Sequence, residues 1–294
     1  MNEAQARLSA SASGAFAIGG EKAVSRLGFG AMRLTGEGIW GEPRDPAECK
    51  RVLRRAVELD INLIDTADSY GPDVSERLIA EALYPYPDNL VIATKGGFLR
   101  SGPNRWDPDG RPQHLRQACE GSLTRLRLER IDLYQLHRID PEVTLEESVG
   151  ALVELRDEGK IARIGLSNVS LDQLRRAREL TTVVSVQNRY NLVDRTAEDV
   201  LEECEREGIA FLPWFPLSTG KLASGNGPLA QVAERHRATP AQIALAWLLR
   251  RAAVMLPIPG TASVGHLEEN VGAAAIELSG EEENLLAGLG AEGH

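Results

Sequence analysis

The sequence predicts an α/β fold in which strands and helices alternate and close into a barrel. Eight short apolar runs recur along the chain, and segments with the apolar spacing of helices separate them. Strands that are regularly separated by helices pair in parallel, and eight such units close a (β/α)8 TIM barrel. The predicted strands are residues 27–31, 61–65, 90–95, 131–137, 162–167, 183–188, 210–215 and 254–259. The predicted helices are residues 46–59, 74–83, 113–126, 145–158, 171–180, 196–207, 240–250 and 264–274.

The structural alternative is a doubly wound open sheet, which normally carries the dinucleotide-binding pattern Gly-x-Gly-x-x-Gly after its first strand. This chain has Gly28, Gly30 and then Arg33 at those positions. The third glycine of the pattern lets helix and strand pack closely, so an arginine there weakens this alternative. The barrel remains the preferred prediction.

Segments outside the eight repeats also carry local signals. Residues 1–14 are small and polar, so we expect them to be disordered or weakly attached. Residues 16–20 end in a Gly-Gly pair and are followed by residues 23–26. This pattern predicts an N-terminal β-hairpin that turns at the glycines. Ser279 and Glu282 have the spacing of a capping box at the start of a helical tail.

No Pro/Ser-rich linker divides the sequence, so residues 1–294 are predicted to form a single domain. The long irregular connections are expected at residues 36–41, 96–111 and 217–227. Each follows the end of a predicted strand, which is where a barrel keeps its binding loops.

The composition disfavours several classes of partner. Acidic residues outnumber basic ones by 43 to 33, which gives a formal net charge of −10. Because such a surface repels nucleic acid and anionic membranes, neither is an expected partner. No apolar run has the length of a signal peptide or a membrane span. Cys49, Cys119 and Cys204 lie far apart in helix-like stretches, so we expect buried thiols, no metal site and a cytoplasmic location.

Three successive predicted strands end at residues that can do chemistry. The second strand ends at Asp65, the third at Lys95 and the fourth at His137, and Tyr70 follows five residues after Asp65. Taken singly, a strand-end Asp is more often a cap, a Lys a solvated charge and a His a structural residue. Their equivalent positions on consecutive strands predict one shared site at the carboxyl end of a barrel.

In this order, Asp65, Tyr70, Lys95 and His137 resemble the catalytic tetrad of the aldo-keto reductase superfamily. The resemblance also includes Gly-Phe-Gly-Ala-Met at 28–32, Ile-Gly-Leu-Ser-Asn at 164–168, Gln-Asn-Arg-Tyr-Asn at 187–191, and Ile-Pro-Gly-Thr at 258–261 followed by Glu269 and Asn270. Residues 81–86, 215–217 and 261–267 are similar to a bacterial branch that includes an NADPH-dependent pyridoxal reductase. The resemblance implies NADPH-dependent reduction of a small aldehyde or ketone to an alcohol, with pyridoxal as a specific candidate.

Carbonyl reduction by hydride transfer builds negative charge on oxygen, so the site needs a proton donor and hydrogen-bonding groups. Tyr70 is the expected donor, and Lys95 is expected to favour its phenolate. Asp65 is expected to pair with Lys95 and offset the cost of burying the ammonium. His137 is expected to hydrogen-bond the substrate carbonyl.

The resemblance also implies a set of cofactor-binding residues. Ser167, Asn168 and Gln187 are expected to hold the nicotinamide carboxamide, with Trp214 stacked on the ring. The full predicted set is Gly30, Met32, Asp65, Ser167, Asn168, Gln187, Trp214, Phe215, Pro216, Leu217, Ser218, Lys221, Gly260, Thr261, His266, Glu269 and Asn270.

The phosphate end of the cofactor site departs from the family pattern. Many relatives grip the 2′-phosphate with a lysine and an arginine, where this chain has Gly260 and His266. Thr261, Ser263 and the N-terminus of the helix near Val264 are expected to hold an anion instead. NADPH is expected ahead of NADH.

The predicted substrate pocket consists of residues in loops after the strands. They are Met32, Trp40, Tyr70, Phe98, Trp106, His137 and Arg138. The alternative for all of them except Tyr70 and His137 is an ordinary loop anchor. An alternative function is a cofactor-binding regulatory or redox-sensing subunit with little turnover. A metal-dependent hydrolase is disfavoured, because the five histidines lack ligand spacing. We expect a monomer or a small homo-oligomer that acts on a small-molecule carbonyl.

Overall fold

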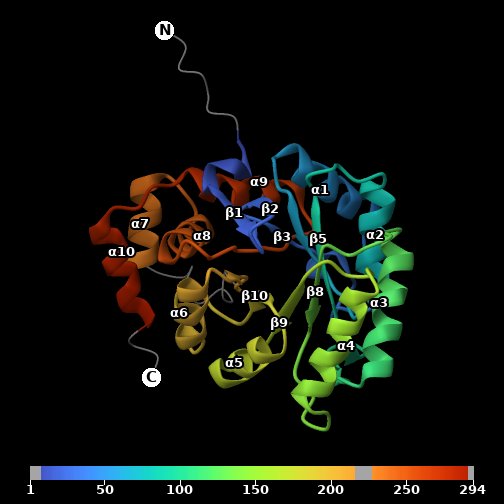
Figure 1. The fold of residues 1–294 in the computed structure, drawn as a ribbon. Coiled ribbons are helices and arrows are strands. Elements are labelled where there is room, and N and C mark those ends of the chain that lie inside the picture. Colours follow the sequence, from blue (N-terminus) through green and yellow to red (C-terminus); the bar gives the residue numbers. More distant parts are fainter. Residues whose placement is uncertain (1–7, 216–226, 291–294) are drawn as a thin grey trace.

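The computed structural model describes residues 8–215 and 227–290, and its centre is a parallel sheet that curls into a barrel (Figure 1). Each strand pairs in parallel with its neighbours. In sheet order the strands are β11 (Ala210–Phe211), β10 (Val183–Gln187), β9 (Ile164–Ser167), β8 (Leu133–Leu136), β5 (Val91–Gly96), β4 (Leu63–Asp65) and β3 (Phe29–Gly30).

The eighth predicted strand, residues 254–259, joins the two edges of this sheet without forming a regular strand. On one side, the backbone of Phe211 makes two hydrogen bonds of 2.8 Å with it. On the other side, the N–H of Gly28 donates to the carbonyl oxygen of Pro257 at 2.9 Å. Pro257 and Pro259 have no N–H to give to a ladder, which explains the missing strand. The segment closes the ring, and the predicted barrel fold is confirmed.

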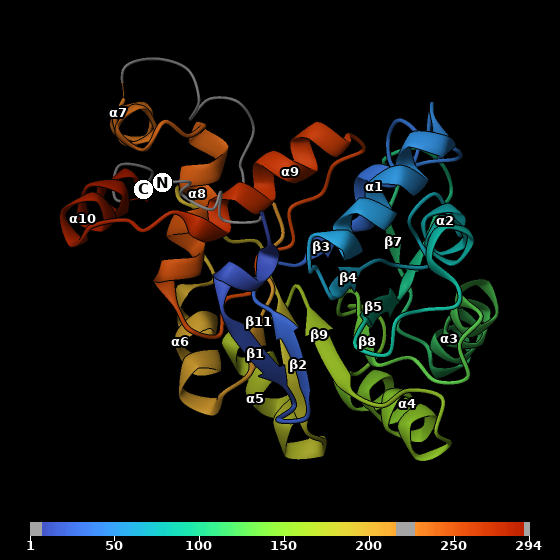
Figure 2. The ribbon, with the colours of Figure 1, turned by 90° about the horizontal axis from the view of Figure 1, so that it is seen from above.

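The helices form a layer around the outside of the barrel (Figure 2). Each predicted helix is present, and its ends differ from the prediction by no more than two residues. The helices are α1 (Pro46–Glu58), α2 (Val74–Leu83), α3 (Pro112–Leu126), α4 (Leu145–Asp157), α5 (Leu171–Leu180), α6 (Glu198–Glu207), α7 (Pro228–His236), α8 (Pro240–Arg251), α9 (Val264–Gly272) and α10 (Gly280–Ala287). The predicted capping box of Ser279 and Glu282 begins α10.

Helix α7 was not predicted from the sequence. Its first turn contains Pro228, and Leu229, Val232 and Ala233 are buried at helical spacing. This short apolar pattern follows the predicted connection at 217–227, of which the structure describes only Gly227.

The N-terminal hairpin packs against the interior of the barrel. Strands β1 (Ala15–Ile18) and β2 (Lys22–Ser25) pair antiparallel. Their inward side chains, Ile18 and Val24, belong to the buried cluster that fills the barrel. The hairpin predicted from the sequence is therefore confirmed (Figure 2).

The segment before the hairpin differs from the expectation for residues 1–14. In its described part, residues 10–13 form a 3₁₀ turn, Ala10 is fully buried and the Ala10 N–H donates to the Leu59 carbonyl oxygen at 2.8 Å. The Ser13 hydroxyl accepts from the Leu27 N–H at 3.0 Å. Small side chains let this segment lie close against the end of α1, which composition alone does not show.

Three further features concern one loop, the cysteines and the length of the helices. The connection predicted as irregular at 96–111 contains a small antiparallel pair, β6 (Phe98–Leu99) and β7 (Asp107–Pro108). Cys49, Cys119 and Cys204 are buried and unbridged, as expected. Within the described residues, no helix is long and apolar enough to cross a membrane.

Truncating a leucine inside the barrel should test its core. Leu133 is fully buried in the interior cluster, so Leu133→Ala should lower the free energy of unfolding by about 2–5 kcal/mol. Leu180 on α5 is 45% exposed, so Leu180→Ala should change it by less than about 0.5 kcal/mol. Urea unfolding of both variants measures the difference. Equal losses would mean that the interior is not packed as described.

Candidate active site

The four residues that the sequence predicts to do chemistry meet at the carboxyl ends of neighbouring strands. Asp65 ends β4, Lys95 is the next-to-last residue of β5, and His137 follows directly after β8. Tyr70 lies in the loop between β4 and α2. In parallel barrels this edge carries the loops that bind and react, so the strand-end prediction leads to one shared site.

Lys95 is the centre of a network of polar contacts that includes Asp65, Thr66 and Tyr70. Its side chain is 0% exposed, and its Nζ donates to Asp65 Oδ2 at 2.7 Å, to the Thr66 carbonyl oxygen at 2.8 Å and to Tyr70 Oη at 3.4 Å. An ammonium group has three N–H donors, so these three acceptors satisfy it fully. Burial acts to lower the pKa of Lys95, but Asp65 and Tyr70 outweigh it and raise the pKa above its ordinary value. The buried lysine is therefore charged.

The second oxygen of Asp65 is held by two amides. Asp65 Oδ1 accepts from Gln187 Nε2 at 2.8 Å and from Gln135 Nε2 at 3.1 Å. These bonds leave the carboxylate with donors on both oxygens, which a buried anion requires. Gln135 was missed by the sequence prediction. Its position two residues before His137 on one strand was the available signal, because alternate residues of a strand face the same side.

Tyr70 is a protonated phenol close to a fixed cation. Its side chain is buried, and burial raises its pKa above the ordinary value while Lys95 acts to lower it. Because burial outweighs the cation, the free site holds the neutral phenol. A phenolate formed by loss of that proton would be stabilised by the ammonium 3.4 Å away.

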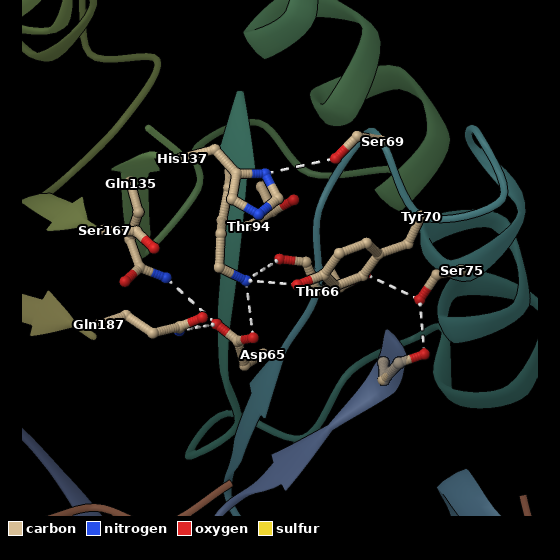
Figure 3. A network of polar contacts seen from close by, with 12 residues as sticks. Asp65, Thr66, Ser69, Tyr70, Ser75, Thr94, Gln135, His137, Ser167 and Gln187 are labelled. Carbon is tan, nitrogen blue, oxygen red and sulfur yellow. Dashed lines mark hydrogen bonds and ion pairs between the residues drawn. The ribbon is translucent and has the colours of Figure 1, made fainter. Parts of the chain in front are cut away.

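His137 is held as a neutral ring with one nitrogen turned to the open space. Burial and then the cations Lys95, Arg100 and Arg138 lower the pKa of His137 well below its ordinary value. The Ser69 Oγ lies 3.3 Å from Nδ1. The other ring nitrogen, Nε2, points away from Ser69 toward the space in front of Tyr70 (Figure 3).

A cavity of about 440 Å³ opens beside these groups. That volume lies in the range of small-molecule sites. The predicted residues that line it are Gly30, Met32, Asp65, Tyr70, Phe98, Trp106, His137, Arg138, Ser167, Asn168, Gln187, Trp214, Phe215 and Gly260. Arg33, Ile39, Ile258 and Pro259 also line it and were not predicted as site residues. The nearest signals were predicted residues beside them in sequence: Met32 before Arg33, Trp40 after Ile39, and Gly260 after Ile258 and Pro259.

Aromatic rings form one wall of the cavity. The ring centroids of Phe98 and His137 are 4.7 Å apart, and those of Phe98 and Trp106 are 5.4 Å apart. Tyr70 meets Trp106 edge to face at 6.3 Å. Edge contacts of this kind fix the ring orientations, so the wall has a defined shape.

Arg100 holds this wall in place and was missed by the sequence prediction. Its guanidinium lies 3.6 Å from the Trp106 ring centroid and donates to the Ser69 carbonyl oxygen at 2.7 Å. It also donates to the carbonyl oxygens of Gly38 at 3.2 Å and Arg105 at 2.7 Å. Arg100 bridges three separate loops, and no residue spacing in the sequence predicts such a contact.

Trp40 does not line the cavity, although it was predicted there. It packs instead on the outer side of Arg100, whose guanidinium lies 5.7 Å from the Trp40 ring centroid. This contact fits the alternative role of a loop anchor for Trp40.

The opposite side of the cavity carries hydrogen-bonding side chains. Asn168 Nδ2 donates to Ser167 Oγ at 2.9 Å, and Asn168 Oδ1 accepts from Trp214 Nε1 at 3.1 Å. Asn168 has a φ of 57°, a left-handed conformation that asparagine tolerates well. Together with Gln187, these groups offer both donors and acceptors, which fits a carboxamide.

The predicted residues for the far end of the cofactor do not line this cavity. Glu269 Oε1 accepts from the Thr239 hydroxyl at 2.6 Å, Asn270 is buried and His266 is exposed. The Thr261 hydroxyl accepts from the Ser263 N–H at 3.1 Å. Pro216, Leu217, Ser218 and Lys221 lie outside the described residues.

The start of α9, expected to hold an anion, already faces a carboxylate of the chain. Glu48 Oε1 accepts from the Val264 N–H at 3.1 Å. This bond, and then Arg51, lowers the pKa of Glu48. In this structure the negative charge at this helix terminus comes from Glu48 on α1, and the expectation that the terminus holds a cofactor anion stays a prediction.

Among the described residues, no group of three or more His, Cys, Asp or Glu side chains has the arrangement of a metal site.

A profile of the Aldo/keto reductase family matches residues 26–290. The chain belongs to this family. The resemblance drawn from the tetrad order is therefore confirmed, and with it the class of oxidoreductase. This aldo/keto reductase is 53% identical over 274 residues to an uncharacterized oxidoreductase of Schizosaccharomyces pombe, covering 93% of the chain and 88% of that relative.

Two further relatives bear on its function. The chain is 42% identical over 279 residues to pyridoxine 4-dehydrogenase of Escherichia coli, covering 93% of the chain and 97% of that enzyme. The crystal structure of an aldo-keto reductase from Klebsiella pneumoniae in complex with NADPH superposes with a TM-score of 0.78 at 27% identity, covering 92% of this chain and 93% of the other.

The contact between Ser69 and His137 predicts the tautomer of this imidazole. If the Ser69 hydroxyl donates to Nδ1, the ring proton stays on Nε2. Imidazole ¹⁵N spectra of the protein should show the Nε2–H form, with no titration of His137 between about pH 8 and about pH 6 because its pKa is lowered. Ser69→Ala should introduce the Nδ1–H form, whereas Ser101→Ala on an exposed loop should not. A His137 that titrates near its ordinary pKa would contradict the neutral assignment.

Proposed function

We propose that this aldo/keto reductase reduces a small aldehyde to the alcohol with NADPH, and that pyridoxal is such a substrate. The observation that carries the proposal is the position of Lys95 Nζ, which joins the Asp65 carboxylate and the Tyr70 hydroxyl in one buried network beside the cavity. The pyridoxal assignment is supported by the 42% identity to pyridoxine 4-dehydrogenase.

The chain's own residues supply proton transfer and charge stabilisation. A carbonyl oxygen in front of Tyr70 gains negative charge as the bond is reduced, and the protonated phenol gives it a proton. The phenolate left behind is stabilised by Lys95, whose own position is fixed by Asp65. His137 Nε2–H donates a hydrogen bond to the same oxygen and orients the substrate.

The cofactor fits the cavity side that carries Ser167, Asn168 and Gln187. A carboxamide needs both a donor and an acceptor, and these side chains offer both near the indole of Trp214. When bound, NADPH supplies the hydride that no side chain can deliver. The apolar and aromatic wall opposite excludes water from the reacting carbon.

Removing the proton donor should separate chemistry from cofactor binding. Tyr70→Phe should lower pyridoxal reduction about 10²- to 10⁴-fold, because it removes the acid and leaves the ring. Loss of NADPH absorbance measures turnover, and quenching of protein fluorescence measures NADPH affinity, which should change little. Tyr84→Phe, at a 51% exposed tyrosine, is the matched control and should keep full turnover. Unchanged turnover in Tyr70→Phe would overturn this role.

An assay of NADPH consumption by the wild-type protein distinguishes an enzyme from a cofactor-binding subunit. A reductase consumes NADPH with pyridoxal or with another member of a panel of small aldehydes. Binding of NADPH with no turnover on any of them would favour the regulatory or redox-sensing alternative.

Glu48 should influence the choice between NADPH and NADH. Its carboxylate occupies the Val264 N–H at the N-terminus of α9, where the family resemblance places the 2′-phosphate. Glu48→Gln removes a negative charge from that position, so NADPH should bind about two- to fivefold more tightly while NADH affinity stays the same. Fluorescence titration with both cofactors measures this. Equal changes for the two cofactors would place the phosphate elsewhere.

A further inference from the structure

The charges that line the cavity do not cancel. Asp65 is the one acidic residue among the described lining residues, and its carboxylate is neutralised by Lys95. The lining also contains two arginines, Arg33 and Arg138. Neither makes an ion pair with a carboxylate of the described residues. Within the described ranges, the cavity therefore has two positive charges without carboxylate partners, in a chain whose net charge is −10.

The two arginines lie on different sides of the cavity. Arg33 follows β3, and its side chain lies over Gly260, among the residues that line the side expected to bind the cofactor. Arg138 follows β8 directly after His137. Strands β4 and β5 separate β3 from β8 in the sheet. We therefore do not expect the two guanidinium groups to bind the same group of a ligand. Arg138 is the neighbour in sequence of His137, whose ring packs against Phe98 of the aromatic wall.

The remaining cation near this wall is already engaged. Arg100 uses its N–H groups on the carbonyl oxygens of Ser69, Gly38 and Arg105, and its face on Trp106. Arg138, in contrast, is exposed at the cavity, and its guanidinium makes no hydrogen bond to another residue in the described part of the chain. Its charge also reaches His137, since it contributes to the lowered pKa of that ring.

We propose that the preferred carbonyl substrate carries an acidic oxygen group, such as a carboxylate, which Arg138 binds while the carbonyl faces Tyr70 and His137. Pyridoxal, whose ring phenol is its only acidic oxygen group, is then expected to be a poorer substrate than a carboxylated aldehyde. This inference rests on the proposed function, because it names the substrate class of the same site. His137 is buried and Arg138 next to it is exposed, so the anionic group lies toward the open mouth and the carbonyl lies deeper. A planar guanidinium recognises two acidic oxygens at once, which selects for orientation as well as charge.

A pair of aldehydes that differ only in charge tests this directly. They are 4-carboxybenzaldehyde and its methyl ester, both flat and with similar electron withdrawal at the carbonyl. The wild-type protein should have a higher kcat/KM for the acid, and Arg138→Gln should lower the acid-to-ester ratio of kcat/KM about tenfold or more. Arg138→Lys should recover part of the ratio because it keeps the charge. Arg33→Gln, a change of the same type on the other side, should alter both substrates by the same factor.

Two measurements on the wild-type protein keep the test independent of how the variants fold. Added salt should lower kcat/KM for the acid more than for the ester, since it screens the guanidinium. The product analogue 4-(hydroxymethyl)benzoate should bind more tightly than its methyl ester, as measured by quenching of tryptophan fluorescence. An acid-to-ester ratio near one in turnover and in binding would overturn the inference. Preferential binding of the acid without any turnover would leave the inference standing and refute the proposed reductase function instead.

Discussion

The buried ion pair between Lys95 and Asp65 is the constraint on which the site depends. An ammonium group inside a barrel is costly to bury, and it is stable there because its three N–H groups meet three acceptors and its partner carboxylate is held by two amides. The strand register places Lys95 directly beside Gln135 and Asp65 beside Ala93. A slip of one residue in either pair would turn one of these groups out of the barrel.

The rest of the site is built from loops, and these need their own support. The wall of Phe98, Trp106 and His137 comes from two different βα connections. Arg100 provides the cross-links, because backbone carbonyl oxygens of three loops accept from one guanidinium that also stacks on Trp106. The chain's own contacts therefore hold the aromatic side of the cavity in shape, which lowers the cost of ordering on binding.

Charge is distributed unevenly around this framework. The chain is acidic as a whole, yet the cavity keeps Arg33 and Arg138 without carboxylate partners in the described residues. At the start of α9, by contrast, Glu48 supplies a negative charge to a helix terminus. The cavity charges therefore attract anions. In contrast, the helix terminus at which the family resemblance implies the cofactor phosphate already faces the carboxylate of Glu48. Both features concern which ligands are chosen and leave the proton-transfer network untouched.

The sequence by itself determined the alternation of strands and helices, the parallel barrel that follows from it, and the meeting of Asp65, Tyr70, Lys95 and His137 at one end of that barrel. These are readable because apolar periodicity and strand ends are local properties of the chain. Tertiary structure alone decided the closure through Pro257 and Pro259, the packing of residues 8–14, and the roles of Gln135, Arg100 and Glu48. Each of these depends on partners that lie far away in sequence, and no spacing rule encodes which distant groups the barrel brings within hydrogen-bond distance.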